Sequence, residues 1–148
     1  DAAMREMYVT GRMHNRVRMI VACYLTKHLQ TDWRVGLKWF EECLVDHDPA
    51  SNAMGWQWSA GSGPDATPYF RVFNPETQAE KFDPKGIYRR KWLDTETSAE
   101  AASYFEAIPR SWGVSKAEGR PSKMIDLKVG RQRALDAYQD FKAQGQTS

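Results

Sequence analysis

The sequence predicts an all-α fold, a helical bundle formed by a single domain. Apolar residues recur three and four positions apart through much of the 148-residue chain, which is the spacing of a buried helix face. Several of these stretches begin with a capping residue followed by proline, as in Asp48-Pro49. No set of stretches alternates between apolar and polar residues, as the strands of a sheet do. A chain of this length is expected to bury one core, so the fold needs no second domain.

The first half of the chain contains four expected helices. The sequence opens on an amphipathic helix, and a second helix is expected over 15–29, where Arg16 and Lys27 lie off the apolar stripe. A Thr-Asp pair offers an N-cap for a third helix that runs to about residue 45. The Asp-Pro pair that follows predicts a fourth helix over 49–58.

The second half is expected to be less regular at first. Only about ten residues around Tyr69 to Phe73 look extended. Asn74-Pro75 and Asp83-Pro84 then repeat the capping signal, which predicts two short helical pieces. Two longer helices are expected over 98–108 and 126–142.

The composition excludes several classes of protein. The charged fraction of 27% and the hydrophobic fraction of 41% are close to globular averages. The longest apolar stretch, 19–25, is far shorter than the ~20 residues that span a bilayer, so we expect a cytoplasmic protein without a membrane segment. Cys23 and Cys43 belong to no Cys-x-x-Cys or Cys/His cluster, so neither a disulfide framework nor a metal site is expected. The formal charge of +2 permits nucleic-acid binding without requiring it.

The stretch "MGWQWSAGSGPDATPYFRVFNP", residues 54–75, places two tryptophans beside a glycine-containing loop that carries an arginine. On a helix, Trp56 and Trp58 are about 200° apart and cannot share a face, so one can line a cavity while the other meets an opening. The alternative is that both simply pack in the core or at its rim. Arg71 is either a solvated loop charge or a phosphate contact beside an aromatic platform, which flipped or single-stranded nucleotides require.

A second group of candidate site residues consists of the arginines at the start of the second helix and "DHD" at 46–48. Arg16 and Arg18 point to different sides of that helix. An arginine on the apolar side needs a carboxylate, because an unpaired buried charge costs about 3–5 kcal/mol. Asp46 or Asp48 can supply it. The alternative is that "DHD" only caps the next helix.

Taken together, these motifs resemble a known family. The run from "MHNRVRM" through "DWRVGLKWF", "DHDPASNAMGWQW" and "FRVFNP" to "RRKWL" is similar to the C-terminal half of the helical FAD-binding domain of DNA photolyases and cryptochromes. The resemblance is dense over 1–93 and returns in "RQRALDAYQDFK", so 128–143 corresponds to the last helix of that domain. The segment 94–127 departs from the usual family sequence. The expected architecture is therefore the C-terminal portion of a photolyase-like FAD-binding domain over residues 1–148.

The resemblance implies that FAD is the cofactor. By that likeness Asn15 and Arg18 line the flavin pocket, and Arg18 pairs with Asp46. Asp48 faces the polar edge of the flavin ring. Asn52 sits at the ring nitrogen that gains and loses a proton, where plant-type cryptochromes place an aspartate.

The resemblance also implies electron transfer and DNA binding. Trp56 corresponds to the relay tryptophan nearest the flavin and Trp33 to the next one outward, so the implied catalytic residues are Trp56, Trp33 and Asn52. Trp58 corresponds to the residue that stacks on a pyrimidine dimer flipped out of damaged DNA. The expected remaining DNA contacts are Met19 to the dimer and Arg16 and Arg71 to phosphates.

The subtype follows from two of these positions. Photolyases for the (6-4) lesion carry a histidine pair where this chain has Asn15 and Met19, neither of which can act as an acid. A microbial cyclobutane-dimer photolyase is therefore the better match. The alternatives are a cryptochrome that senses blue light without repairing DNA, and a standalone helical remnant with a structural or nucleic-acid-binding role.

Two departures qualify the resemblance. Arg12 stands where many family members have a tryptophan. The sequence also lacks the antenna domain and the other parts of the family that lie upstream, so a missing N-terminal part of the same protein is an expected partner. The 148 residues alone are expected to bind FAD weakly or not at all and to be inactive without that part.

Overall fold

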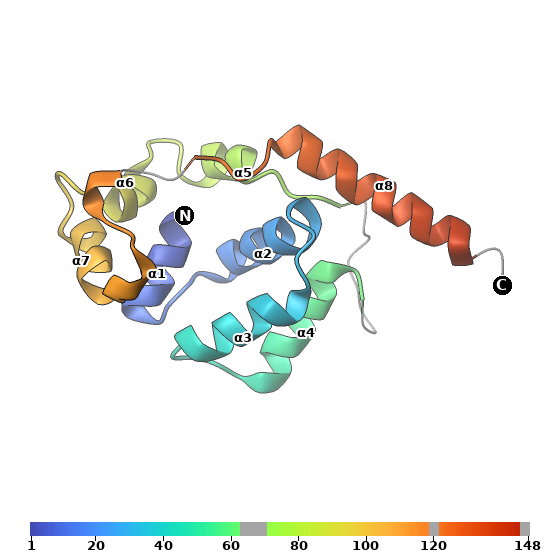
Figure 1. The fold of residues 1–148 in the computed structure, drawn as a ribbon, viewed down its shortest axis with the longest axis horizontal. Coiled ribbons are helices and arrows are strands. Elements are labelled where there is room, and N and C mark those ends of the chain that lie inside the picture. Colours follow the sequence, from blue (N-terminus) through green and yellow to red (C-terminus); the bar gives the residue numbers. More distant parts are fainter. Residues whose placement is uncertain (63–70, 119–121, 146–148) are drawn as a thin grey trace.

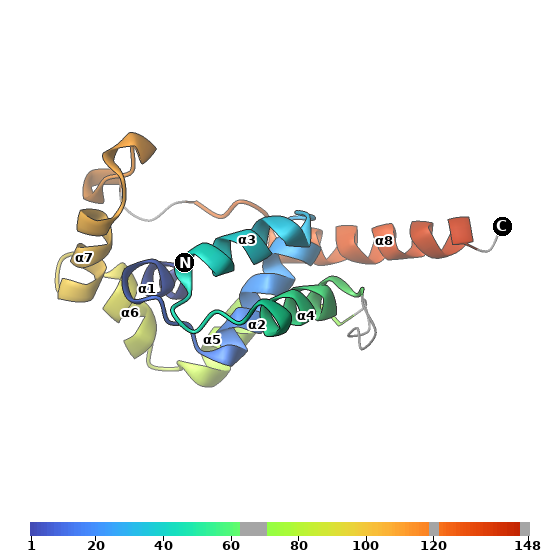
Figure 2. The same cartoon turned by 90° about the horizontal axis from the view of Figure 1, so that it is seen from below.

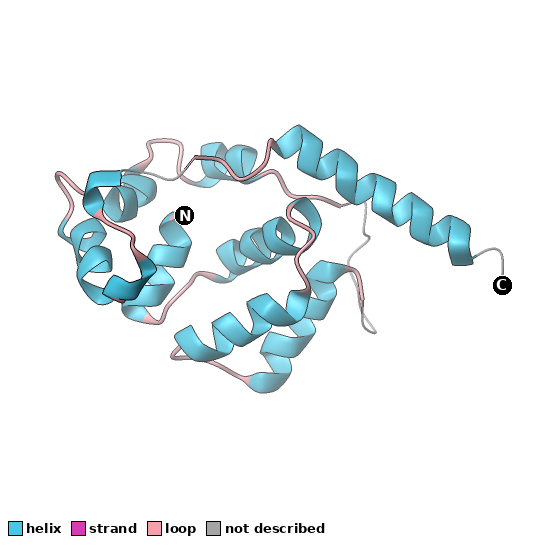
Figure 3. Cartoon of the chain, viewed as in Figure 1, coloured by secondary structure: helices cyan, strands magenta, loops and turns pink. Residues whose placement is uncertain are grey.

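The computed structural model describes residues 1–62, 71–118 and 122–145. Within these ranges all regular structure is helical, which confirms the predicted class (Figure 3). The helices are α1 (Ala2–Thr10), α2 (Asn15–Cys23), α3 (Trp33–Cys43), α4 (Pro49–Ala60), α5 (Pro75–Phe82), α6 (Ile87–Leu93), α7 (Ala99–Ala107) and α8 (Leu127–Gly145). A π-helical turn, η1 (Tyr24–His28), continues α2, and two short 3₁₀ turns, η2 (Arg110–Trp112) and η3 (Lys116–Glu118), lie between α7 and α8.

The core lies between the helices of the first half. Helix α4 packs on both α2 and α3, while α1 packs on α6 and α7 at the other end of the molecule (Figure 1). Apolar side chains from these elements form one cluster, whose buried members include Met7, Met13, Phe40, Leu44 and Trp56. Helix α8 contacts η1 near its own start and then extends away from the rest of the fold, as Figures 1 and 2 both show. None of the helices in the described ranges combines the length and the apolar character needed to cross a bilayer.

N-caps form at four helix starts, and three of them, Asp32, Asp48 and Asn74, were predicted from the sequence. Asp32, Asp48, Asn74 and Ser98 each accept a hydrogen bond from a backbone N–H in the first turn of the helix that follows. These bonds satisfy N–H groups that have no partner inside the helix. The predicted helices over 49–58, 98–108 and 126–142 therefore appear within a few residues of their expected limits.

Asp83-Pro84 does not open a helix as predicted. Asp83 ends α5, and α6 begins only at Ile87. Gly86 adopts a left-handed conformation with φ of 64° and turns the chain between the two helices. The carboxylate of Asp83 nevertheless accepts the N–H groups of Tyr88 and Arg89, at 3.2 and 3.1 Å. The capping chemistry was predicted correctly, and its position was wrong because the turn adds residues before the helix.

The second helix was predicted to present Lys27 outside its apolar stripe, and this is wrong. The turn η1 has the wider π geometry, in which each N–H reaches back five residues instead of four. Lys27 and His28 are each only 1% exposed. Helix α8 lies over this turn at Gly130, where a Cβ atom would come within 2.7 Å of His28 Nδ1. The glycine inside α8 is therefore explained by the close approach of the imidazole.

Candidate functional site

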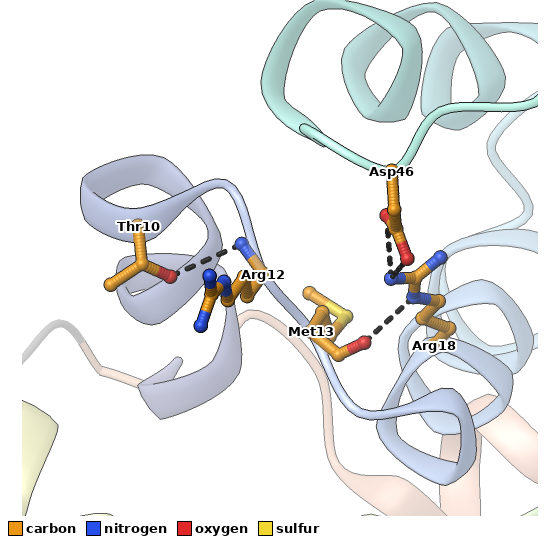
Figure 4. A network of polar contacts seen from close by, with 5 residues as sticks. All are labelled: Thr10, Arg12, Met13, Arg18 and Asp46. Atoms are coloured by element: carbon orange, nitrogen blue, oxygen red, sulfur yellow. Dashed lines mark hydrogen bonds and ion pairs between the residues drawn. The ribbon is translucent and has the colours of Figure 1, made fainter.

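An ion pair joins α2 to the loop between α3 and α4. The Nη2 group of Arg18 donates to both carboxylate oxygens of Asp46, at 2.9 and 2.8 Å (Figure 4). The Nε group of Arg18 donates to the carbonyl oxygen of Met13 at 2.8 Å. The Arg18 side chain is 27% exposed and that of Asp46 is 60% exposed. The pairing expected from the resemblance is present, and it holds the guanidinium in one orientation from two sides.

Asp48 has a different local role from Asp46. Its Oδ1 accepts the Ser51 N–H at 2.7 Å, and this bond caps α4. The same hydrogen bond lowers the pKa of the Asp48 carboxyl, because it stabilises the ionised form. The residue is exposed. The capping interpretation of "DHD" is therefore correct for Asp48, while Asp46 supplies the partner of Arg18.

An open pocket lies beside the ion pair. Its volume is about 520 Å³, and its polar lining comes from Glu6, Arg12, His14, Arg18, Asp46 and Tyr88. The backbone N–H of Arg12 donates to Thr10 Oγ1 at 3.1 Å (Figure 4). The hydroxyl of Tyr88 donates to the Glu6 carboxylate, and burial together with this bond raises the pKa of Tyr88. Arg12, the departure from the family pattern, thus adds a third basic side chain to the wall that already holds His14 and Arg18.

Asn52 lies in the first turns of α4 and is half-buried. Its Nδ2 donates to the carbonyl oxygen of Leu37 on α3 at 3.0 Å. Among the described residues no hydrogen bond reaches its Oδ1, so this oxygen is available to accept one. The amide cannot ionise, so the position offers a neutral acceptor at any pH.

Trp56 and Trp58 occupy different environments, as their spacing predicts. Trp56 is 2% exposed and meets Phe40 edge to face, with ring centroids 4.9 Å apart. Trp33, from the start of α3, packs against the same apolar cluster. Trp58 is half-buried and is not a member of that cluster. The inner and outer tryptophans of α4 are therefore separated by the helix itself.

The remaining expected site residues divide between two places. Asn15 and Arg16 are exposed at the start of α2, and Met19 is half-buried one turn later. The Arg16 guanidinium lies 4.2 Å from the centroid of the Phe82 ring, at the end of α5. Arg71 is exposed. It follows residues 63–70, which lie outside the described ranges and include the first part of the segment that was expected to be extended.

The Arg71 segment is attached near the opposite end of the second helix from Arg16. The carbonyl oxygen of Arg71 accepts a hydrogen bond from Lys27 Nζ at 2.9 Å. Lys27 lies eleven positions after Arg16, which corresponds to roughly 16 Å along the helix axis. Arg16 and Arg71 are therefore both attached to the second helix, but near its opposite ends.

Sequence reasoning missed the buried polar group around η1. Lys27 donates to the carbonyl oxygen of Arg71, and Cys23 and His28 make hydrogen bonds to the backbone of Phe73. A regular helical period gives no signal for this cluster, because it places Lys27 away from the buried face. Within the described ranges no group of three or more His, Cys, Asp or Glu side chains could hold a metal ion.

Comparisons with known proteins identify the relatives of this chain. Residues 1–140 match the family model described as the FAD binding domain of DNA photolyase. The deoxyribodipyrimidine photo-lyase of Agrobacterium fabrum is 49% identical over 148 residues, which cover 96% of this chain and 31% of that protein. The deoxyribodipyrimidine photo-lyase of Escherichia coli is 43% identical over 143 residues, which cover 94% of this chain and 29% of that protein. The chain therefore spans about a third of the length of the curated relatives it matches.

Solved structures give the same grouping. The crystal structure of a bacterial class III photolyase from Agrobacterium tumefaciens matches with a TM-score of 0.77 at 49% identity, over 96% of this chain and 31% of that one. The Synechocystis sp. PCC6803 cryptochrome matches with a TM-score of 0.72 at 35% identity, over 91% of this chain and 29% of that one.

Proposed function

The chain belongs to the family of FAD-binding domains of DNA photolyases, and from that premise we propose that it is part of a deoxyribodipyrimidine photo-lyase, which uses light and FAD to split cyclobutane pyrimidine dimers in DNA. Because the chain spans about a third of its relatives, the proposal includes a longer polypeptide, called the longer protein below. Residues 1–148 form the C-terminal part of its FAD-binding domain, with 94–127 as a divergent segment.

The donor set of the chain fits FAD. The polar edge of a flavin ring presents both carbonyl acceptors and an N–H donor, so a mixture of guanidinium, amide and carboxylate groups matches it. Such a mixture lies on α2, on the loop after α3 and on the first turns of α4: Asn15, Arg18, Asp46, Asp48 and Asn52. When bound, FAD supplies the light-driven electron chemistry.

The residues of this chain orient the cofactor. Asp46 fixes Arg18, so the guanidinium does not have to be ordered when the cofactor binds. Asn52, held through its Nδ2, keeps its Oδ1 as a neutral acceptor for the ring nitrogen. Trp56 is buried in the core cluster and Trp33 packs against that cluster, an arrangement compatible with short electron hops between indoles.

The residues outside the cluster form the proposed DNA face. Trp58 supplies a stacking surface for a flipped base, and stacking of this kind contributes about 1–3 kcal/mol per base. Met19 contacts the dimer. Arg16 and Arg71, held near opposite ends of one helix, contact phosphates on either side.

The observation that carries this proposal is the separation of Trp56, sealed in the core, from Trp58, outside it. The test is blue-light repair of an oligonucleotide with one thymine dimer, using the longer protein with and without light. We expect bound flavin and loss of the dimer in the light only. Flavin photoreduction without repair would contradict the proposal and favour a light sensor, the alternative that the likeness to the Synechocystis cryptochrome supports.

A further inference from the structure

Three hydrogen bonds fix the backbone that carries Arg71. Lys27 Nζ donates to the Arg71 carbonyl at 2.9 Å. His28 Nε2 lies 3.0 Å from the Phe73 carbonyl and carries the proton, since a carbonyl can only accept. The Phe73 N–H donates to Cys23 Sγ at 3.3 Å. The backbone groups that are bound belong to Arg71 and Phe73, two residues apart, so the end of α2 and η1 together bind one edge of the segment in the way that a neighbouring strand would.

The bonds leave the Arg71 side chain exposed while its backbone is held. Lys27 reaches this carbonyl from a position that is 1% exposed, and burial lowers the pKa of its ammonium group. The nearby charge of Arg71 adds to that effect, so two cations lie close together. An anion bound at Arg71 would relieve their repulsion.

We propose that Lys27 is a positioning residue for DNA binding: by holding the Arg71 carbonyl, it places the Arg71 guanidinium where it contacts a phosphate of the damaged strand. This inference rests on the proposed function. A long side chain on a fixed backbone loses less freedom when it binds, so the affinity of the Arg71 contact depends on the Lys27 hydrogen bond. His28 and Cys23 support the same segment two residues further on.

The test compares Lys27→Met, Arg71→Ala and the double variant in the longer protein. The probe is an oligonucleotide with one thymine dimer, and its Kd is measured over a range of salt concentrations. We expect each single variant to weaken binding about tenfold at low salt, the equivalent of one charge-assisted hydrogen bond. Each should also reduce the magnitude of the salt slope by about 1. The double variant should bind as Arg71→Ala does, because Lys27 acts only through Arg71.

Thr26→Val is the matched control. Thr26 is buried in the same turn, but its hydroxyl donates to Ala22 within its own helix and not to the Arg71 segment. It should lower the thermal midpoint without changing Kd or the salt slope. If Lys27→Met does not fold, Cys23→Ala takes its place, because it removes the acceptor of the Phe73 N–H. Cys23→Ala should weaken DNA binding less than Lys27→Met would. In the Arg71→Ala background it should cause no further loss of binding.

Several outcomes would overturn the inference. Lys27→Met with wild-type Kd and slope, or a double variant whose losses multiply, would show that Lys27 does not act through Arg71. If Arg71→Ala leaves both DNA binding and light-dependent repair unchanged, this inference is overturned and the proposed function stands. No preference for damaged DNA and no repair in the unmodified longer protein would overturn both.

Discussion

The indole of Trp56 lies directly on Gly36. A methyl group at position 36 would come within 2.6 Å of Trp56 Cζ2 and would overlap the adjoining ring atoms Cη2 and Cζ3. Phe40, one turn further along α3, meets the same ring edge to face. The missing side chain at Gly36 therefore allows α3 and α4 to approach closely enough to seal the inner tryptophan.

Gly36→Ala is expected to destabilise the fold. The added methyl group has no space, so the ring or the helix must move, at a cost of about 1–3 kcal/mol in the free energy of unfolding. Gly55→Ala on α4 is the control, since a Cβ there meets no atom within 4 Å. It should stabilise by about 0.5–1 kcal/mol through helix propensity. Urea unfolding of the chain measures both, and equal effects would contradict the packing described.

Asp46→Asn is expected to separate stability from cofactor binding. The pair with Arg18 is partly exposed, so its loss should change the free energy of unfolding by less than about 1 kcal/mol. FAD binding by the longer protein should weaken about tenfold, because the guanidinium is no longer fixed. Asp32→Asn, which breaks the exposed pair with Arg34 and keeps an N-cap, should leave flavin content unchanged. Equal flavin content in both variants would argue against a cofactor role for Asp46.

Asp48 should contribute a pH-dependent part of the stability. Its folded-state pKa lies below the usual 3.8, so the unfolded chain binds the proton more readily. The stabilisation is therefore complete above the usual pKa and disappears as pH falls through the lower, folded value. Asp48→Asn retains the cap without the charge. Urea midpoints from about pH 6 to about pH 2 should fall more steeply in the wild type than in this variant, and parallel curves would refute the effect.

Trp58→Ala is expected to affect DNA and not flavin. In the longer protein it should weaken binding of dimer-containing DNA by about 1–3 kcal/mol while flavin stays bound, because the side chain lies outside the core cluster. Trp56→Phe is the counterpart, and it should slow flavin photoreduction with DNA affinity retained. Equal loss of flavin and DNA in Trp58→Ala would mean that the outer face is wrongly assigned.

The sequence was sufficient for features that depend on neighbouring residues. The caps at Asp32, Asp48 and Asn74 are set within one turn, so the pattern locates those helix starts. The opposite faces of Trp56 and Trp58 follow from helix geometry alone. Reasoning from the residues left Asp46 and Asp48 as equal candidates for Arg18, and the family resemblance was needed to choose Asp46, which the structure confirms.

The features that sequence reasoning missed depend on distant contacts. The π geometry of η1 coincides with hydrogen bonds to residues 71 and 73, more than forty positions away. No local pattern contains that information, so Lys27 was expected outside the core and no role was predicted for His28. Asp83 was misplaced for a different, local reason, because the left-handed conformation of Gly86 decides where the next helix can begin.

The π turn makes the chain sensitive to its length at one point. Deleting a single residue between Tyr24 and His28 would restore the ordinary helical repeat, because the π turn accommodates one extra residue. The deletion would move the Lys27 and His28 side chains relative to the carbonyl oxygens that they contact and to Gly130 of α8. Relatives with one residue fewer in this turn are therefore expected to differ in how α8 packs against it, even where every other position agrees.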